Sequence, residues 1–142
     1  MSIPVIDLFA GPGGLGEGFS RFKGVNFEVG VSIEKDWMAF ETLQLRAAHR
    51  ALSKSGLATQ AVWRQWDAIL ASEPWNIVFE KLRGSGVPAI AAACEAARKE
   101  AWNVELGPSN REAISLGIKQ RMKRFMTGQH LPTNAVLSGG PP

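Results

Sequence analysis

The chain has 142 residues, of which 45% are hydrophobic and 20% are charged, and its formal net charge is +3. This length suits one domain or a part of a larger one, and the composition is that of an ordinary globular protein. A single cysteine excludes an intrachain disulfide, two histidines give no zinc-ligand spacing, and the apolar runs are too short to span a bilayer. The mild basicity is compatible with a nucleic-acid partner but is weak support for one. Because no basic segment precedes the first apolar run, we expect a cytoplasmic protein without a membrane partner.

Short apolar runs that alternate with helical patterns predict strands separated by helices. In the first part of the chain we expect a strand over 3–9, a helix over about 15–22, a strand over 27–33 and a helix capped by Asp36 that runs to about 52. Irregular helical segments follow over 53–86, and then a helix over 89–101. The last part is expected to hold a strand over 102–106, a helix that begins with a capping box at 109–112, and a strand over 135–138. This order predicts an α/β fold with a parallel sheet of about four strands.

Ligands of such sheets bind beyond the carboxyl ends of the strands, and the most distinctive residues of this chain fall there. The loop from Gly11 to Gly16 follows the first strand and matches G-x-G-x-x-G, while Glu34 ends the second. Glycines let a ligand approach bare backbone, and a carboxylate at Glu34 can accept hydrogen bonds from both hydroxyls of a ribose. These features indicate an adenosine-containing cofactor and leave NAD, FAD and S-adenosylmethionine open, beside a tight turn that binds nothing.

Three segments resemble signatures of the DNA (cytosine-5) methyltransferase family, in the family's order. Residues 5–14, VIDLFAGPGG, are similar to its first signature, and residues 32–36, SIEKD, resemble its second. Residues 138–142, SGGPP, resemble the start of the signature in which the catalytic cysteine follows at once. The resemblance implies a Rossmann-like class I methyltransferase fold, with residues 1–142 as the N-terminal part of the catalytic domain. It also implies that S-adenosylmethionine is the cofactor.

The family's roles transfer to matching positions of this chain. The resemblance implies that Phe9 packs on the adenine, that the backbone of residues 10–15 surrounds the methionine moiety, and that Asp7 braces the loop. The cofactor-contacting set is Phe9, Ala10, Gly11, Gly13, Gly14, Leu15, Glu34, Lys35, Gly140 and Pro142. Without the family, Phe9 is equally well a core residue, and Glu34 an acid at a helix start.

The chain also departs from the family. The third signature's aspartate has no clear copy, and Glu105 is the nearest candidate. The distance from Glu34 to Glu105 exceeds one βαβ unit and implies a helical insertion, at about 53–100. Its tryptophans (Trp63, Trp66 and Trp75) are expected to form a small core of their own in preference to stacking on bases.

Two further features are expected to be structural. The basic residues before the last strand (Lys119, Arg121, Lys123 and Arg124) could contact DNA phosphates, but a solvated helix face is the more common role for such a run. Cys94 lies far from every signature and is expected to be a buried small residue.

The resemblance implies methyl transfer to C5 of a cytosine that is flipped out of duplex DNA. In the family, the nucleophile follows the position of Pro142, so this chain alone is expected to be inactive. Its expected partners are duplex DNA, through the complete enzyme, and either a C-terminal half or a second copy that covers the exposed edge of the sheet. The alternatives are a dinucleotide-binding (NAD or FAD) Rossmann fragment, a non-catalytic module or subunit of a split methyltransferase, and another methyltransferase class.

Overall fold

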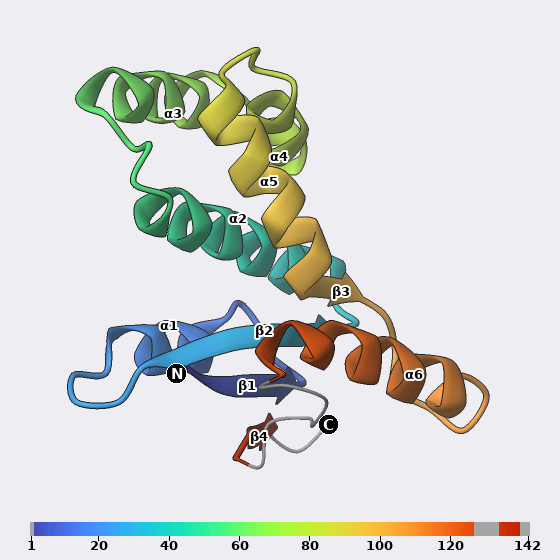
Figure 1. Ribbon diagram of the computed structural model, residues 1–142. Helices are drawn as coiled ribbons and strands as arrows, with labels where there is room; N and C mark the ends of the chain where they lie inside the picture. Colours follow the sequence, from blue (N-terminus) through green and yellow to red (C-terminus); the bar gives the residue numbers. More distant parts are fainter. Residues whose placement is uncertain (1, 127–133, 140–142) are drawn as a thin grey trace.

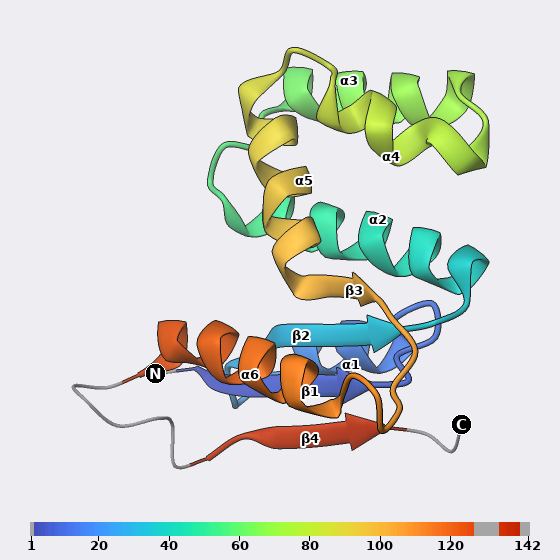
Figure 2. The ribbon, with the colours of Figure 1, turned by 90° about the vertical axis from the view of Figure 1, so that its right-hand side faces the viewer.

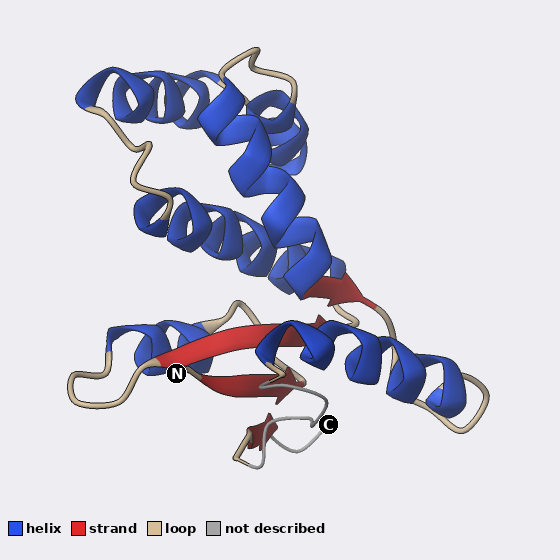
Figure 3. Ribbon diagram, viewed as in Figure 1, coloured by secondary structure: helices blue, strands red, loops and turns tan. Residues whose placement is uncertain are grey.

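The computed structural model describes residues 2–126 and 134–139, which form a four-stranded sheet and six α-helices. The elements are β1 (Ile3–Leu8), α1 (Gly14–Arg21), β2 (Phe27–Glu34), α2 (Trp37–Lys54), α3 (Gln60–Ser72), α4 (Trp75–Arg83), α5 (Pro88–Glu100), β3 (Ala101–Asn103), α6 (Arg111–Met122), the 3-10 helix η1 (Lys123–Phe125) and β4 (Val136–Gly139). The alternation of helices and strands is easily followed in Figure 3. The predicted α/β class is therefore confirmed.

All strand pairs are parallel, and the order across the sheet is β3-β2-β1-β4. The arrowheads of β2, β3 and β4 in Figure 2 accordingly point the same way. The chain first adds strands on one side of β1 and then returns to place β4 on the other side. The order reverses beside β1, and parallel sheets bind ligands at such a reversal, outside the carboxyl ends of the strands.

Helices cover both faces of the sheet, with α1 on one face and α6 on the other (Figure 1). The side chains of β2 change faces across Gly30. Val31 and Ile33 pack with Met122 of α6, whereas Val29 approaches Gly16 of α1. Gly30 is the extra residue at a register shift with β1, where Val5 pairs with Val29 and Ile6 pairs with Val31.

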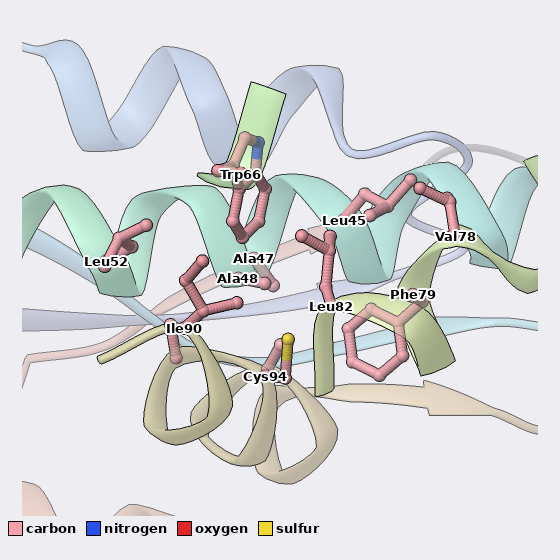
Figure 4. Packing of buried hydrophobic residues seen from close by; sticks show 12 residues of the cluster. Leu45, Ala47, Ala48, Leu52, Trp66, Val78, Phe79, Leu82, Ile90 and Cys94 are labelled. Carbon is pink, nitrogen blue, oxygen red and sulfur yellow. The ribbon is translucent and has the colours of Figure 1, made fainter. Parts of the chain in front are cut away.

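The helices α2 to α5 form a helical lobe, defined here as residues 37–100, beyond the β3 edge of the sheet (Figure 2). Its core comes from all four helices, and ten of the residues are labelled in Figure 4. The buried members are Leu45, Ala47, Ala48, Leu52, Trp66, Val78, Phe79, Leu82, Ile90, Ala93, Cys94 and Ala97. The insertion expected at about 53–100 corresponds to α3, α4 and α5, but it shares this core with α2 instead of closing on itself.

The tryptophans of the insertion divide between core and surface. Trp66 is buried and Trp63 packs against the same cluster, as the prediction of a local core requires. Trp75 is 52% exposed at the start of α4, so its assignment to that core was wrong. A position at the N-terminus of a short helix, directly after Pro74, turns this side chain away from the other helices.

The third strand and the helix after it begin in a different way from the prediction. The strand covers Ala101–Asn103, not 102–106, because its only partner, β2, ends opposite Asn103 at Glu34. The capping box at 109–112 does not form. Helix α6 begins after Asn110, whose side chain accepts from the Gly107 N–H and donates to the Glu105 carbonyl. This amide stabilises the turn between β3 and α6 in place of the helix terminus.

Candidate functional site

The glycine loop after β1 has a backbone conformation that most side chains avoid. Phe9, Gly11 and Gly13 have φ angles of 58°, 55° and 89°. Backbone hydrogen bonds help to hold the loop: the Ala10 N–H donates to Ile33 O of β2 at 2.9 Å, and the Gly13 N–H donates to Ala10 O at 3.0 Å. Glycine adopts positive φ without strain, whereas Phe9 does so at an energetic penalty that is typical of functional sites.

Two of the glycines serve the site in different ways. A Cβ on Gly13 would lie 2.9 Å from Leu43 Cδ1, so the loop can pack against α2 only because no side chain is present. Gly14 begins α1, and a Cβ on it would meet no atom within 4 Å. Gly14 therefore leaves the first turn of α1 open to a ligand, with unpaired N–H groups as hydrogen-bond donors.

Glu34 links the glycine loop to the start of α2. Its Oε2 accepts from the Gly11 N–H at 2.8 Å, and its Oε1 accepts from the Asp36 N–H at 2.7 Å. Asp36 in turn caps α2 by accepting from the Ala39 N–H at 2.8 Å, as predicted. Because an ionised carboxylate has about four acceptor positions, Glu34 keeps capacity for two further donors.

A hollow of about 180 Å³ lies beside Glu34, across the carboxyl ends of β1, β2 and the segment after β3. Its lining is Phe9, Ile33, Lys35, Val104, Glu105 and Leu106. The Lys35 ammonium pairs with Glu105 Oε1 at 3.3 Å. The volume is below the roughly 300–1,000 Å³ of complete small-molecule sites, so this hollow suits one flat ring system and not an entire cofactor.

Sequence reasoning missed several residues of this site. Asn103 donates through its side-chain amide to Glu34 O at 3.0 Å and to Lys35 O at 3.1 Å. It thereby fixes the backbone that carries both residues. Asn103 was missed because the predicted strand, 102–106, placed it inside the strand instead of at its end. The aliphatic lining residues Val104 and Leu106 could have been found as the first apolar residues after a strand.

A larger apolar hollow of about 530 Å³ lies beside α6 and shares Leu106 with the smaller one. Its other lining residues are Leu8, Gly107, Arg111, Ile114, Ser115, Ile118 and Lys119. Neither the glycine loop nor Glu34 reaches it. The convergent polar groups that orient a cofactor are at the smaller hollow, and we therefore place the candidate site there.

Asp7 lies below the loop and is 1% exposed. It occupies a row across the sheet between Ser32 of β2 and Ser138 of β4. Within the described part of the chain, neither carboxylate oxygen of Asp7 nor the Ser32 hydroxyl has a hydrogen-bond partner. Burial raises the pKa of the Asp7 carboxyl, and Ser138 and the Arg50 guanidinium oppose this more weakly. Asp7, which was expected to brace the loop, is thus a buried carboxyl whose oxygens lack hydrogen-bond partners in the described residues.

Most of the predicted site residues come together at this edge. Phe9, Lys35 and Glu105 share the small hollow, and the backbone of Ala10, Gly11, Gly13 and Gly14 runs beside Glu34. Leu15 is an exception, since its side chain is 54% exposed and lines a separate apolar hollow with Phe19 and Phe22. Only its backbone faces the loop. Gly140 and Pro142 lie outside the described residues.

The basic residues of α6 and η1 are partly engaged inside the molecule. Arg121 donates to Gly30 O at 3.1 Å, and Arg124 pairs with Glu28. Lys119 and Lys123 are exposed. Two of the four cations thus hold α6 and η1 against β2, whereas a solvated helix face was expected for all four.

Cys94 is buried in the lobe core, and its surroundings raise the pKa of its thiol to about 12, mainly by desolvation. A thiol with this pKa is almost entirely protonated at neutral pH and is a poor nucleophile. The expectation that Cys94 is structural is met by its location.

Over residues 2–126 and 134–139, no group of three or more histidine, cysteine, aspartate or glutamate side chains could hold a metal ion. In the same residues no helix combines the length and apolar character needed to cross a membrane. Comparison with models of protein families, with curated proteins and with solved structures found no match.

Proposed function

We propose that this chain binds S-adenosylmethionine as the cofactor-binding part of a DNA (cytosine-5) methyltransferase. The observation that carries the proposal is the hydrogen bond between the Gly11 N–H and Glu34 Oε2, which joins the two signature segments at one site. Beside this bond lies the hollow of Phe9, Lys35 and Glu105. The residues that resemble the family are therefore adjacent in space as well as ordered in sequence.

Each part of the site suits one part of this cofactor. The flat ring of an adenine fits the small hollow, where Phe9 is 38% exposed and offers a face for stacking. The ribose hydroxyls would donate to the two unused acceptor positions of Glu34. The loop backbone from Ala10 to Gly14 would follow the chain that leads to the sulfur.

When bound, S-adenosylmethionine supplies a methyl group on a sulfonium, which is an electrophile. The residues of this chain would bind and orient it, with Glu34 fixing the sugar and the loop excluding side chains from the methionine path. Orientation of this kind lowers the barrier by making attack effectively intramolecular. The buried and protonated Cys94 is unsuited to attack a cytosine, so we propose that the 142-residue chain alone transfers no methyl group.

A dinucleotide-binding module is the second candidate, and one observation favours it. A Cβ on Gly16, the third glycine of the G-x-G-x-x-G match, would lie 3.4 Å from Val29 Cγ2. Close packing of the helix on the next strand is the role of that glycine in dinucleotide-binding folds.

Titration of the purified chain with S-adenosylhomocysteine, NAD and FAD separates the two candidates. We expect saturable binding of S-adenosylhomocysteine, with NAD and FAD at least tenfold weaker, because the small hollow accepts one ring and the site holds one ribose carboxylate. Tighter binding of NAD or FAD would overturn the proposal in favour of the dinucleotide module.

A methyl-transfer assay tests the second part of the proposal. Unmethylated duplex DNA and labelled S-adenosylmethionine are incubated with the chain, and no label above that of heat-inactivated protein is expected in the DNA. Transfer above that background would contradict the claim that the chain lacks a working nucleophile.

A further inference from the structure

A polar groove of about 530 Å³ lies between α1 and α2, next to the glycine loop. Its lining is Gly14, Glu17, Gly18, Arg21, Arg46 and His49. The small hollow borders the loop at Phe9, and this groove borders it at Gly14. An extended ligand that follows the loop from the hollow therefore ends in the groove.

The charges of the groove leave one cation without a partner. The Glu17 carboxylate pairs with Arg50 and also with Arg21 at 3.4 Å. Arg50 also pairs with Glu100 at 2.5 Å, so both carboxylates near the groove are neutralised. Arg46, in contrast, has no carboxylate at ion-pairing distance anywhere in the described ranges.

Arg46 is also placed against the loop. Its Cδ lies 3.7 Å from the position that a Cβ on Gly13 would occupy, so the side chain runs along the outside of the loop. Gly14 and Gly18 of α1 face the groove without a side chain, and a Cβ on either would meet nothing within 4 Å. An anion in the groove could thus approach both the guanidinium of Arg46 and the first turn of α1.

We propose that Arg46 binds the carboxylate of the amino-acid end of the cofactor. The inference rests on the proposed function, because it takes the adenosine end to lie in the hollow of Phe9. A guanidinium binds a carboxylate through two parallel N–H donors, which fixes orientation as well as adding affinity. Arg46 is therefore a positioning and specificity residue that selects ligands carrying an amino-acid tail on the adenosine.

A phosphate of DNA is the other anion that the groove could accept. The open side of the groove offers one unpaired arginine, whereas proteins that track a DNA backbone place several cations along it. Arg46 also lies against the glycine loop at Gly13, which is where the cofactor is proposed to bind. We therefore assign the cofactor carboxylate, and DNA binding becomes an outcome of the test.

The test measures the binding of two adenosine ligands and of duplex DNA to four proteins by titration calorimetry. S-adenosylhomocysteine carries the carboxylate, and 5′-methylthioadenosine has the same adenosine and sulfur without the amino-acid group. The proteins are the wild type, Arg46→Gln, Arg46→Lys and Arg64→Gln. The last removes an exposed charge from α3, away from the groove.

Arg46→Gln should weaken the binding of S-adenosylhomocysteine by roughly tenfold or more, because the charge-assisted bonds to its carboxylate are lost. The affinity of Arg46→Gln for 5′-methylthioadenosine should stay within about twofold of the wild-type value. The affinity of Arg64→Gln should stay within the same limit for both ligands. Arg46→Lys should recover part of the loss because the charge remains.

Three results would overturn the inference. Equal losses for both ligands would show that Arg46 acts on the loop in general, and unchanged affinity for both would show that it binds neither. A loss of affinity for duplex DNA with unchanged S-adenosylhomocysteine binding would assign the groove to a phosphate. Failure of the wild type to bind S-adenosylhomocysteine at all would instead reject the proposed function, and with it the premise of this inference.

Discussion

The helical lobe and the carboxyl edge of the sheet use the same kinds of residue in opposite ways. In the lobe, large apolar side chains such as Leu52, Leu82 and Ile90 are fully buried against one another. At the edge, Phe9 is 38% exposed, and one of the fully buried side chains is a carboxyl, Asp7. The contrast separates a region that is packed for stability from a region where the groups proposed to bind the cofactor stay accessible.

One ion-paired arginine connects the two regions. Arg50 of α2 pairs with Glu17 of α1, next to the glycine loop, and with Glu100 at the end of α5. Burial raises the pKa of the Glu100 carboxyl although Arg50 acts to lower it. The lobe therefore helps to position the loop through a buried ion-pair network. The residues proposed to bind the cofactor do not take part in this network.

Removing Arg50 should have the largest effect. Arg50→Met removes the cation that pairs with the buried Glu100 carboxylate and leaves Glu17 with Arg21 alone, a change that typically lowers the free energy of unfolding by about 3–5 kcal/mol. Urea unfolding followed by circular dichroism measures this loss. Arg98→Met is the matched control on α5, where the pair with Glu95 is exposed and a change of at most about 1 kcal/mol is expected. Equal losses in the two variants would show that the network does not join the regions.

Truncating the lobe core should lower stability without touching the binding edge. Leu82→Ala removes a fully buried side chain, and a loss of about 2–5 kcal/mol is expected from transfer and cavity formation. Leu57→Ala, at an exposed position, should change the unfolding free energy by no more than about 0.5 kcal/mol. Folded Leu82→Ala protein should keep the wild-type affinity for S-adenosylhomocysteine. A clear loss of affinity at full folding would contradict the separation of the two regions.

The smallest effect, of opposite sign, is expected at Asp7. Asp7→Asn removes a buried charge and lets an amide donate to a neighbouring serine, so the unfolding free energy at pH 7 should rise by about 1 kcal/mol. Since burial raises the folded-state pKa of Asp7 above its ordinary 3.8, the folded wild type binds the proton more tightly than the unfolded chain. The contribution of the protonated Asp7 carboxyl to the free energy of unfolding is lost as the pH rises through the raised pKa.

The advantage of Asp7→Asn over the wild type should therefore persist down to the raised pKa and shrink as the pH falls through it toward 3.8. Urea unfolding of both proteins at several pH values measures the difference directly. A lower stability of the variant at pH 7 would show that the Asp7 charge is well satisfied in the folded state.

Local patterns in the sequence were sufficient for the frame of the fold. The apolar run before Gly11 and the valine-rich run before Glu34 predicted β1 and β2, and the cap at Asp36 predicted the start of α2. These signals lie within a few residues of the structure they specify. Because parallel strands share a carboxyl edge, the same patterns placed the loop and Glu34 together.

Features that depend on contacts between distant residues could not be predicted in this way. The strand β3 is short because β2 ends opposite it, and Asn103 binds backbone at Glu34 and Lys35, which lie 69 and 68 positions earlier. The role of Arg46 follows from the packing of α2 on the loop at Gly13. No local pattern near Asn103 or Arg46 reports these partners.

The affinity of Glu34→Gln for S-adenosylhomocysteine tests the account most directly. The substitution keeps the size of the side chain but replaces one of the two oxygens that bind the Gly11 and Asp36 N–H groups. It also removes the charge that would accept the ribose hydroxyls. We predict at least tenfold weaker binding than in the wild type, with Glu112→Gln, an exposed change on α6, unaltered. Wild-type affinity in folded Glu34→Gln protein would contradict the placement of a ribose at this edge of the sheet.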